Sequence, residues 1–304
     1  MRVLVTGASG WIGSAVVPEL IDAGHQVIGL ARSDGSADAL TAAGAQVRRG
    51  TIDDLDVLRS AAAESDGVIH LAFKHDLAFT GDYQGAVDAD FRAVEAFGDA
   101  LEGSDRPLVI ASGLNEFASG RVATERDGLD AGPRDGGPRA RMATAHLTLS
   151  LASRGVRSSV LRLPPTVHGD GDPGFIAALI GIAHTKGVSG YIGDGSQRWP
   201  AVHRLDAARL FRLALDSAPA GSVLHATADE GVPIHAVAEM IGRHLGLPVT
   251  TVSPEDAGEH FGWLSNLLGT DMPASSGLTR DLLDWHPTGP DLLTDLDKGH
   301  YFHR

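Results

Sequence analysis

The chain opens with a short apolar run that passes directly into a glycine-rich turn, and this feature constrains the fold most. Val3–Val5 is followed by Thr6-Gly7-Ala8-Ser9-Gly10-Trp11-Ile12-Gly13 and then by an amphipathic helical pattern. Gly7 permits a tight turn out of the strand, Gly10 lets a phosphate approach the backbone, and Gly13 lets the helix pack closely. The start of the helix offers free N–H groups and partial positive charge. The motif therefore predicts a dinucleotide bound at the first βα junction.

Short apolar runs alternate with helical patterns over the first half of the chain. Strands are expected at Val3–Thr6, Gln26–Leu30, Ala45–Gly50, Gly67–Phe73, Pro107–Ser112 and Ser158–Leu163. Helices are expected at Ile12–Ala23, Ala37–Ala43, Leu55–Ala63, Tyr83–Leu101 and Arg139–Arg154. Such alternation is typical of βαβ units and of a parallel sheet covered on both faces. The sequence therefore predicts an α/β fold, a Rossmann-type doubly wound parallel sheet with a smaller C-terminal substrate lobe.

The regular alternation loosens after Pro164. A turn-rich segment at 169–174 precedes an apolar helix from Phe175 to about His184. Further helices are expected at Leu205–Leu215 and Ile234–Leu245, with a strand at Val223–Thr227 between them. We expect residues 1–169 and 200–227 to form the dinucleotide-binding domain, and residues 170–199 and 228–304 to form the substrate lobe.

The composition limits the possible partners. The chain has 304 residues, no cysteine and a formal net charge of −14. Without cysteine, disulfides and thiolate nucleophiles are excluded, and the histidines lack a metal-ligand spacing with a third ligand, so no metal is expected. The acidic charge disfavours nucleic acid, whose binding needs a basic face. No signal segment or membrane-spanning apolar stretch is visible, which predicts a soluble cytoplasmic protein without membrane contact.

The end of the second expected strand indicates which dinucleotide is bound. A domain that selects NAD(H) usually carries an acidic residue there, which holds the ribose 2′-hydroxyl. Arg32 and Ser33 stand near this position instead, and they suit the 2′-phosphate of NADP(H). The alternative is that Arg32 is a solvated loop residue. The sequence thus favours NADP(H) over NAD(H).

Four segments together resemble the extended or atypical branch of the short-chain dehydrogenase/reductase superfamily, often labelled NAD-dependent epimerase/dehydratase. They are Thr6-Gly7-x-x-Gly10-x-x-Gly13, Val68–Ala72, Leu161–Gly169 and Trp199–Ala208. The resemblance covers most of the chain and implies that the segment from Leu161 passes under the nicotinamide. The expected cofactor-binding residues are Gly7, Ser9, Gly10, Trp11, Ile12, Gly13, Arg32, Ser33, Ile52, Asp53, Ala72, Phe73, Ser112, Arg141, Pro164 and Val167.

The resemblance breaks at the residues that carry the family's usual chemistry. That chemistry uses a tyrosine followed four residues later by a lysine, which lowers the pKa of the tyrosine and holds the ribose. None of Tyr83, Tyr191 and Tyr301 is followed by lysine at this spacing, and the family's interval puts Gly137 and Arg141 at the two positions. A working enzyme must therefore find its proton elsewhere.

Ser112, His75 and Arg141 are the expected catalytic residues. Ser112 ends the fifth strand near the position of the family's catalytic hydroxyl, although a backbone hydrogen bond is an alternative role. His75 follows the fourth strand, at the edge where such sheets bind ligands, and could supply a proton unless it is simply solvated. Arg141 could hold ribose hydroxyls or a phosphate. The expected substrate-binding residues are His168, Phe175, Trp199 and His203, with a structural hydrogen bond and core packing as alternatives for His168 and Trp199.

These observations lead to three hypotheses of function. The first is an NADP(H)-dependent reductase that acts on a small carbonyl compound through an atypical site. The second is a non-catalytic NADP(H)-binding sensor, which the missing tyrosine–lysine pair would explain. The third, an NAD-dependent sugar-nucleotide epimerase or dehydratase, is disfavoured by the missing pair and by Arg32. The resemblance also implies a homodimer, formed through the helices expected at Tyr83–Leu101 and Arg139–Arg154.

Overall fold

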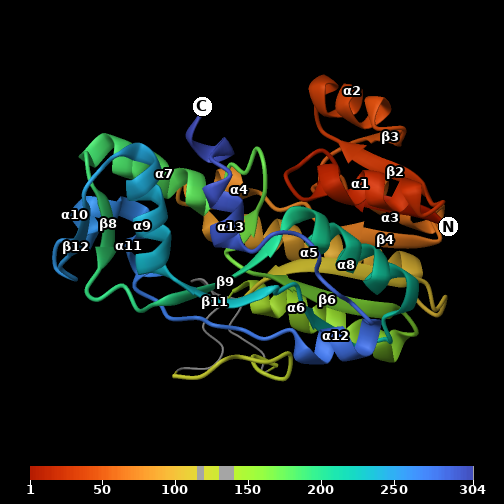
Figure 1. Ribbon diagram of the computed structural model, residues 1–304. Coiled ribbons are helices and arrows are strands. Elements are labelled where there is room, and N and C mark those ends of the chain that lie inside the picture. The colour runs from red at the N-terminus through yellow and green to blue at the C-terminus, as the bar shows by residue number, and fades with distance from the viewer. Residues whose placement is uncertain (115–119, 130–139, 304) are drawn as a thin grey trace.

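A seven-stranded parallel sheet forms the centre of the computed structural model, which describes residues 1–114, 120–129 and 140–303 (Figure 1). Its strands are β1 (Arg2–Thr6), β2 (Gln26–Ala31), β3 (Gln46–Arg49), β4 (Gly67–His70), β5 (Pro107–Gly113), β6 (Arg157–Leu163) and β10 (Ser222–His225). They lie in the order β10-β6-β5-β4-β1-β2-β3. The predicted Rossmann-type parallel sheet is confirmed. The chain reverses direction across the sheet between β1 and β4, and such sheets bind ligands outside the carboxyl ends of the strands at this point.

Helices cover both faces of the sheet because its central strands β1 and β4 are buried on both sides. On one face, α1 (Gly13–Asp22), α2 (Asp34–Ala42) and α8 (Arg204–Ser217) contribute buried residues to one core cluster. On the other face, α3 (Leu55–Ala63), α5 (Tyr83–Leu101), α6 (Arg141–Ser150) and the 3₁₀ turn η1 (Leu151–Arg154) enclose a second cluster. Burial of aliphatic and aromatic side chains in these clusters, each contributing about 1.5–3 kcal/mol, stabilises the body.

Several predicted boundaries differ from the structure, among them two at the candidate site. The fourth strand ends at His70, three residues before the expected end, and a short helix α4 (His75–Phe79) follows after four irregular residues. The sheet pairing of β4 stops there because β1 ends at Thr6 and turns into the glycine loop. The helix expected from Arg139 begins at Arg141 in the described part of the chain, and Arg139 lies outside it.

The lobe lies to one side of the sheet, at the left in Figure 1, and has its own apolar core. It contains a three-stranded sheet, β11 (Asp229–Pro233), β9 (Arg198–His203) and β7 (Thr166–His168), and a two-stranded sheet, β12 (Val249–Val252) and β8 (Ser189–Ile192). Its helical elements are α7 (Phe175–Lys186), α9 (Ile234–Leu245), α10 (Ala257–Phe261), η2 (Gly262–Leu264), α11 (Ser265–Leu268), α13 (Leu292–Asp297) and η3 (His300–Phe302).

One segment assigned to the lobe by the sequence packs on the body instead. Leu283, at the end of α12 (Gly277–Leu283), and Trp285 belong to the same buried cluster as α1 and α8. The indole N–H of Trp285 donates to the carbonyl of Asp206, at 3.1 Å. The chain therefore crosses from the lobe to the body at α12 and returns to the lobe at α13.

The C-terminal segment is held by a buried carboxylate. Asp295 on α13 is 1% exposed, and its Oδ2 lies 3.0 Å from Nδ1 of His168 on β7. The ammonium of Lys298 donates to its other oxygen, at 3.1 Å. Burial acts to raise the pKa of Asp295, but the hydrogen bonds from His168 and Lys298 outweigh it and lower the pKa from 3.8 to about 2.

Asp295 should therefore make stability depend on pH in the acid range. Because its pKa is lower in the folded protein, the ionised carboxylate stabilises the fold above about pH 4, and this contribution disappears as the pH falls towards 2. Asp295→Asn should be less stable than the wild type at neutral pH, with a difference that narrows on acidification. Urea unfolding at a series of pH values measures this, with Asp297→Asn, an exposed carboxylate of the same helix, as the control. A difference that stays constant from neutral pH to pH 2 would contradict the assignment.

Candidate active site

The glycine loop between β1 and α1 has the geometry that close approach of a pyrophosphate requires. Gly7 has a φ of +64°, and a Cβ there would lie 2.8 Å from the backbone nitrogen of Ala72. A Cβ at Gly13 would lie 2.1 Å from the carbonyl oxygen of Gly7. At Gly10, in contrast, a Cβ would meet one described atom within 4 Å, the same oxygen at 3.2 Å. Gly7 and Gly13 are thus needed for packing, while the open side of Gly10 is the cradle that a dinucleotide fits.

Trp11 connects this loop to the segment that follows β6. Its indole N–H donates to the carbonyl of Val167 on β7, at 2.8 Å. The guanidinium of Arg204, the first residue of α8, stacks over the indole ring at 4.1 Å. Pro164 and Val167 are buried in this segment. The contacts bring Arg204 beside the phosphate-binding loop. Sequence patterns could not predict this placement, because almost 200 residues separate Arg204 from the glycines.

The ends of β2, β3 and β4 carry three cations, each opposite a carboxylate. Arg32 lies 3.4 Å from Asp76, and its side chain is 72% exposed. Lys74 lies 2.6 Å from Asp53, and Arg49 lies 2.6 Å from Asp34. Exposed pairs of this kind are worth at most about 1 kcal/mol. Arg32 can therefore exchange its carboxylate partner for a phosphate at little cost.

Ser33 and Ile52 already have structural roles at this end of the site. The hydroxyl of Ser33 accepts a hydrogen bond from the backbone N–H of Ser36 and so caps α2, at 3.2 Å. Ile52 is 6% exposed and belongs to the core beneath α3 and α5.

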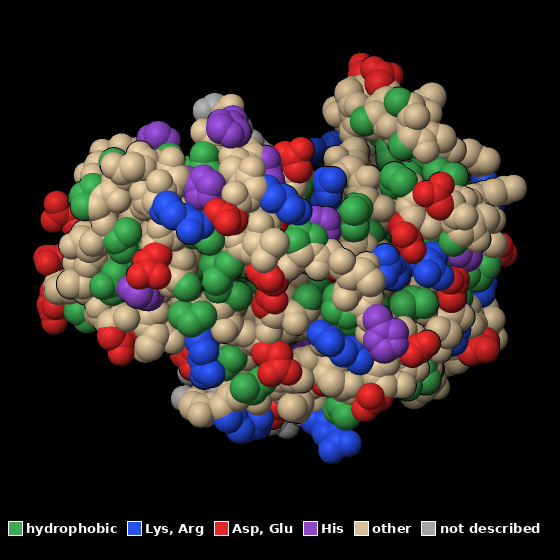
Figure 2. Space-filling model, in the orientation of Figure 1, with side chains coloured by type: hydrophobic (Ala, Val, Ile, Leu, Met, Phe, Trp, Pro, Cys, Tyr) green, Lys and Arg blue, Asp and Glu red, His purple; other side chains and the backbone are tan. Residues whose placement is uncertain are grey.

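On the face in Figure 2 the surface is notched between α2 and the C-terminal end of the chain, and basic and acidic side chains are interspersed there.

A buried polar network runs from the glycine loop to Arg141. Thr6 Oγ1 lies 2.6 Å from Nδ1 of His70, and Nε2 of His70 lies 3.2 Å from Oδ1 of Asp90. The other oxygen of Asp90 faces Nε of Arg141 at 3.8 Å. Arg141 also donates from Nη2 to the carbonyl of Ala111, at 3.1 Å. The Arg141 cation is thereby held at the carboxyl edge of β5.

Asp90 is the counter-charge that makes this arrangement stable. The residue is 2% exposed, and burial alone would raise its pKa. The Arg141 cation and the hydrogen bond from His70 outweigh burial and lower the pKa of Asp90. The carboxylate is therefore ionised at neutral pH, and a buried ionised group of this kind needs its partners.

The ring of Phe73, which follows β4, lies beside Arg141, and we call this ring the aromatic floor. The guanidinium lies 4.1 Å from the centre of the Phe73 ring, a cation–π contact. The ring of Tyr83, the first residue of α5, also lies near Phe73, with 6.3 Å between the ring centres. Ala72 donates its backbone N–H to Thr6, at 3.2 Å, so the Ala72–Phe73 segment lies against the glycine loop.

His75 and Ser112 flank this group. His75 begins α4, and its ring lies 5.1 Å from that of Phe73. Partial desolvation of the ring, followed by repulsion from Arg141, lowers the pKa of His75, so the imidazole is neutral at neutral pH. Ser112 is half-buried on β5, next to the carbonyl that Arg141 binds. Gly137, at the family's tyrosine position, lies outside the described residues.

Two of the four expected substrate-binding residues are buried in the lobe. His168 is 0% exposed and is paired with Asp295. Trp199 is 1% exposed, and its indole N–H donates to the carbonyl of Leu267. In this conformation neither side chain is accessible to a substrate. The contacts fit a structural hydrogen bond for His168 and core packing for Trp199. Phe175 packs on Trp199, and His203 packs on His168; both are partly exposed.

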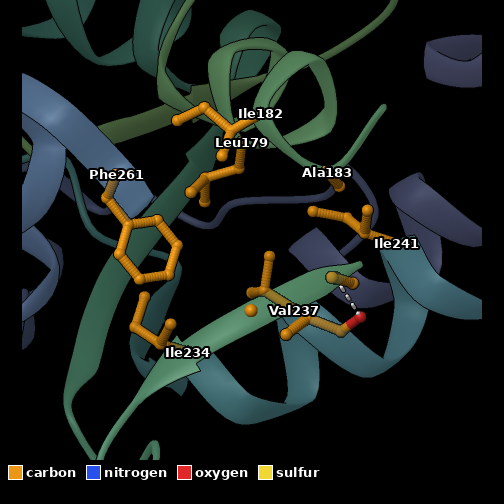
Figure 3. Close-up of a pocket in the computed structure, with 10 residues that line it drawn as sticks. Leu179, Ile182, Ala183, Ile234, Val237, Ile241 and Phe261 are labelled. Carbon is orange, nitrogen blue, oxygen red and sulfur yellow. Dashed lines mark hydrogen bonds between the residues drawn. The ribbon is translucent and has the colours of Figure 1, made fainter. Parts of the chain in front are cut away.

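A small apolar pocket lies within the lobe, among α7, β8, α9 and α10 (Figure 3). Its lining residues are Leu179, Ile182, Ala183, Ser189, Gly190, Ile234, Val237, Ala238, Ile241 and Phe261. None of them carries a charge, and the Ser189 hydroxyl is bonded to the carbonyl of Ala238 at 2.8 Å. The pocket is a packing gap of the lobe core, and it has no group that could take part in catalysis.

The structure adds Asp90, His70 and Tyr83 to the residues that the sequence singles out. Asp90 could have been found, because it lies on the apolar face of a helical pattern, four residues after Ala86 and four before Val94. A carboxylate at such a position needs a partner. Nothing in the sequence pairs it with Arg141, since the two lie on different helices.

Residues 1–114, 120–129 and 140–303 contain no helix that is long and apolar enough to cross a membrane. Within the same ranges, no cluster of three or more histidine or carboxylate side chains is arranged to bind a metal ion.

Comparisons with known proteins place these features in context. Residues 3–225 match the model of the "NAD dependent epimerase/dehydratase family". "Uncharacterized protein C2A9.02" of Schizosaccharomyces pombe is 50% identical over 303 residues, covering 99% of this chain and 100% of that protein. A Stigmatella aurantiaca protein named 4-hydroxy-2-methyl-3-oxo-4-farnesyl-3,4-dihydroquinoline-1-oxide ketoreductase is 28% identical, covering 77% and 70%. The dTDP-glucose 4,6-dehydratase DesIV of Streptomyces venezuelae, solved with NAD and DAU bound, superposes with a TM-score of 0.77 at 19% identity, covering 100% and 97%.

Proposed function

The chain belongs to the NAD-dependent epimerase/dehydratase family, and we propose that it is an NADP(H)-dependent reductase of a small carbonyl compound. The family match supports an enzyme with a nicotinamide dinucleotide cofactor. The glycine loop would hold the pyrophosphate, and Arg141 would lie near the nicotinamide ribose. Bound NADPH would supply a hydride to the carbonyl carbon.

The observation that carries the proposal is the placement of Arg141. The guanidinium is held at the carboxyl edge of β5 by buried Asp90, by the carbonyl of Ala111 and by the ring of Phe73. A cation at this edge stabilises the negative charge that develops on a carbonyl oxygen as its carbon accepts a hydride. Ser112, on the same strand, is the proposed hydroxyl donor to that oxygen. A ketoreductase among the relatives agrees with this chemistry, although at 28% identity it does not identify the substrate.

We propose NADP(H) as the cofactor because Arg32 is exposed and weakly paired at the end of β2. A charge-assisted hydrogen bond to the 2′-phosphate is worth about 1.5–3 kcal/mol. Arg32→Ala should therefore weaken NADPH binding by roughly 10- to 100-fold and leave NADH binding nearly unchanged. Isothermal titration calorimetry with both cofactors measures this, and Arg49→Ala, an exposed arginine already paired at the end of β3, is the matched control. Equal losses for NADPH and NADH in Arg32→Ala would contradict the assignment.

One competing function has a specific observation in its favour. DesIV, a dehydratase of a sugar nucleotide, shares the fold and was solved with NAD. At 19% identity this likeness extends to the fold alone, and Arg32 suits a 2′-phosphate better than the 2′-hydroxyl of NAD.

The non-catalytic sensor becomes the stronger hypothesis if NADPH binds without turnover. A homodimer and a cytoplasmic location stay predictions.

A further inference from the structure

We propose that Tyr83, in the first turn of α5, is the proton donor of the reductase. This inference rests on the proposed function and assigns one step of it. Reduction of a carbonyl requires a proton for the oxygen, and the family's tyrosine position is occupied by glycine in this chain.

Helix α5 carries both Tyr83, at its first position, and Asp90, two turns further along. They are seven residues apart, which places them on the same face of the helix, about 10 Å from each other along its axis. Asp90 faces Nε of Arg141 at 3.8 Å, while the Arg141 guanidinium extends over the ring of Phe73 at 4.1 Å. Tyr83 contacts the same ring, with 6.3 Å between the ring centres. The phenol therefore lies on the Arg141 side of the site, beside the aromatic floor.

The position of Tyr83 is set by the start of its helix. Asp82 caps α5 by accepting the backbone N–H of Gly85, at 2.8 Å, so Tyr83 occupies the first helical position. From there the side chain is half-buried against Phe73. Because Phe73 and Tyr83 lie on neighbouring segments at the carboxyl edge of β4, the phenol is close to where the glycine loop would direct the nicotinamide.

The other two tyrosines of the chain lie in the lobe. Tyr191 is on β8 of the lobe, and its ring packs on that of His235 at 4.8 Å. The hydroxyl of Tyr301 donates to Asp172 at 3.0 Å and accepts the backbone N–H of Gly169 at 3.2 Å. Tyr83 is thus the phenol that the fold brings to the edge of the parallel sheet.

The surrounding charges suit a proton donor better at Tyr83 than at His75. Burial raises the pKa of the Tyr83 phenol, so it carries its proton at neutral pH, while Arg141 acts in the opposite direction and stabilises the phenolate. His75 is neutral at that pH because its pKa is lowered, and a neutral imidazole is a poor acid. The proposed reduction accounts for each transferred hydride and proton. The carbonyl carbon gains the hydride of NADPH, the carbonyl oxygen takes the proton of Tyr83, and the phenolate beside Arg141 is reprotonated from water.

Tyr83→Phe tests this assignment because it removes the hydroxyl and keeps the ring that packs on Phe73. NADPH oxidation should be measured with a panel of aromatic aldehydes, methyl ketones and 1,2-diketones as hydride acceptors. With the acceptors that the wild type reduces, kcat of Tyr83→Phe should fall by about 10²–10⁴-fold, while the Kd for NADPH stays unchanged. Tyr191→Phe, a matched loss of one phenol in the lobe, should keep the wild-type kcat.

The possible failures of the two proposals are distinguishable. A wild-type protein that binds NADPH but oxidises it with no acceptor of the panel would overturn the reductase function, and with it the role of Tyr83. A wild type that turns over, with Tyr83→Phe at the same kcat, would overturn the role of Tyr83 alone. A fall in kcat accompanied by an equal loss of NADPH affinity would also count against proton donation, because it would assign Tyr83 to binding.

Discussion

Replacing Asp90 with asparagine should lower the free energy of unfolding by about 3 kcal/mol or more, since breaking one partner out of a buried ion pair typically costs 3–5 kcal/mol. The carboxylate is 2% exposed, faces Arg141 at 3.8 Å and is bonded to His70 at 3.2 Å. Asparagine keeps the shape of the side chain but leaves Arg141, which is mostly buried, without its counter-charge. The loss should also disturb turnover, because Arg141 would no longer be held against Ala111 and Phe73.

Asp99 provides the matched control for this experiment. It lies on the same helix and pairs with Arg154 at 3.0 Å, but its side chain is 54% exposed. Asp99→Asn should therefore change the free energy of unfolding by at most about 1 kcal/mol. Urea denaturation of both variants and the wild type gives the comparison. Equal effects for Asp90→Asn and Asp99→Asn would show that Asp90 is not the buried counter-charge described above.

Gly13→Ala should largely abolish dinucleotide binding. Its Cβ would lie 2.1 Å from the carbonyl oxygen of Gly7 and 2.7 Å from two backbone atoms of Ala8, so helix α1 must move away from the loop. Each lost hydrogen bond from the helix start to a phosphate costs about 1.5–3 kcal/mol, and two of them amount to about 100-fold in affinity or more. Overpacking should also lower stability by about 1–3 kcal/mol.

Gly10→Ala separates the two effects, because its Cβ would approach the protein only at the Gly7 oxygen, at 3.2 Å. This variant should keep most of its stability without ligand and still bind NADPH poorly, since the methyl group occupies the phosphate surface. Gly181→Ala, in an exposed part of α7 with no described atom within 4 Å of the added Cβ, is the neutral control. Fluorescence titration with NADPH and thermal unfolding measure both quantities. If Gly10→Ala and Gly13→Ala both bind NADPH like the wild type, the loop is not the phosphate site.

The fold could be predicted from local patterns because most strands contain a short apolar run and the glycine motif follows the first of them. What the patterns missed were features set by tertiary contacts. The fourth strand stops at His70 because its partner β1 turns away after Thr6. Likewise, α12 lies on the body because Trp285 is buried beneath α8, which no periodicity in the C-terminal third of the chain indicates.

The residues of the candidate site also fall into two groups, those that local sequence patterns predict and those that only tertiary contacts bring together. Gly7, Gly10 and Gly13 could be assigned from the sequence, because each glycine has a local steric reason. The surroundings of Arg141 could not, because Asp90 reaches it from a helix about fifty residues earlier in the chain. Burial of His168 was likewise unpredictable, since its partner Asp295 is 127 residues away.

The proposed activity of this protein is the transfer of a hydride from NADPH to a carbonyl carbon. The most direct test is to incubate the protein with NADPH deuterated at C4 of the nicotinamide and the carbonyl panel, and to analyse the products by mass spectrometry. We expect an alcohol with deuterium on the former carbonyl carbon, formed with one NADPH consumed per product. Tight NADPH binding without deuterium in any product, or interconversion of a sugar nucleotide without net consumption of cofactor, would contradict it.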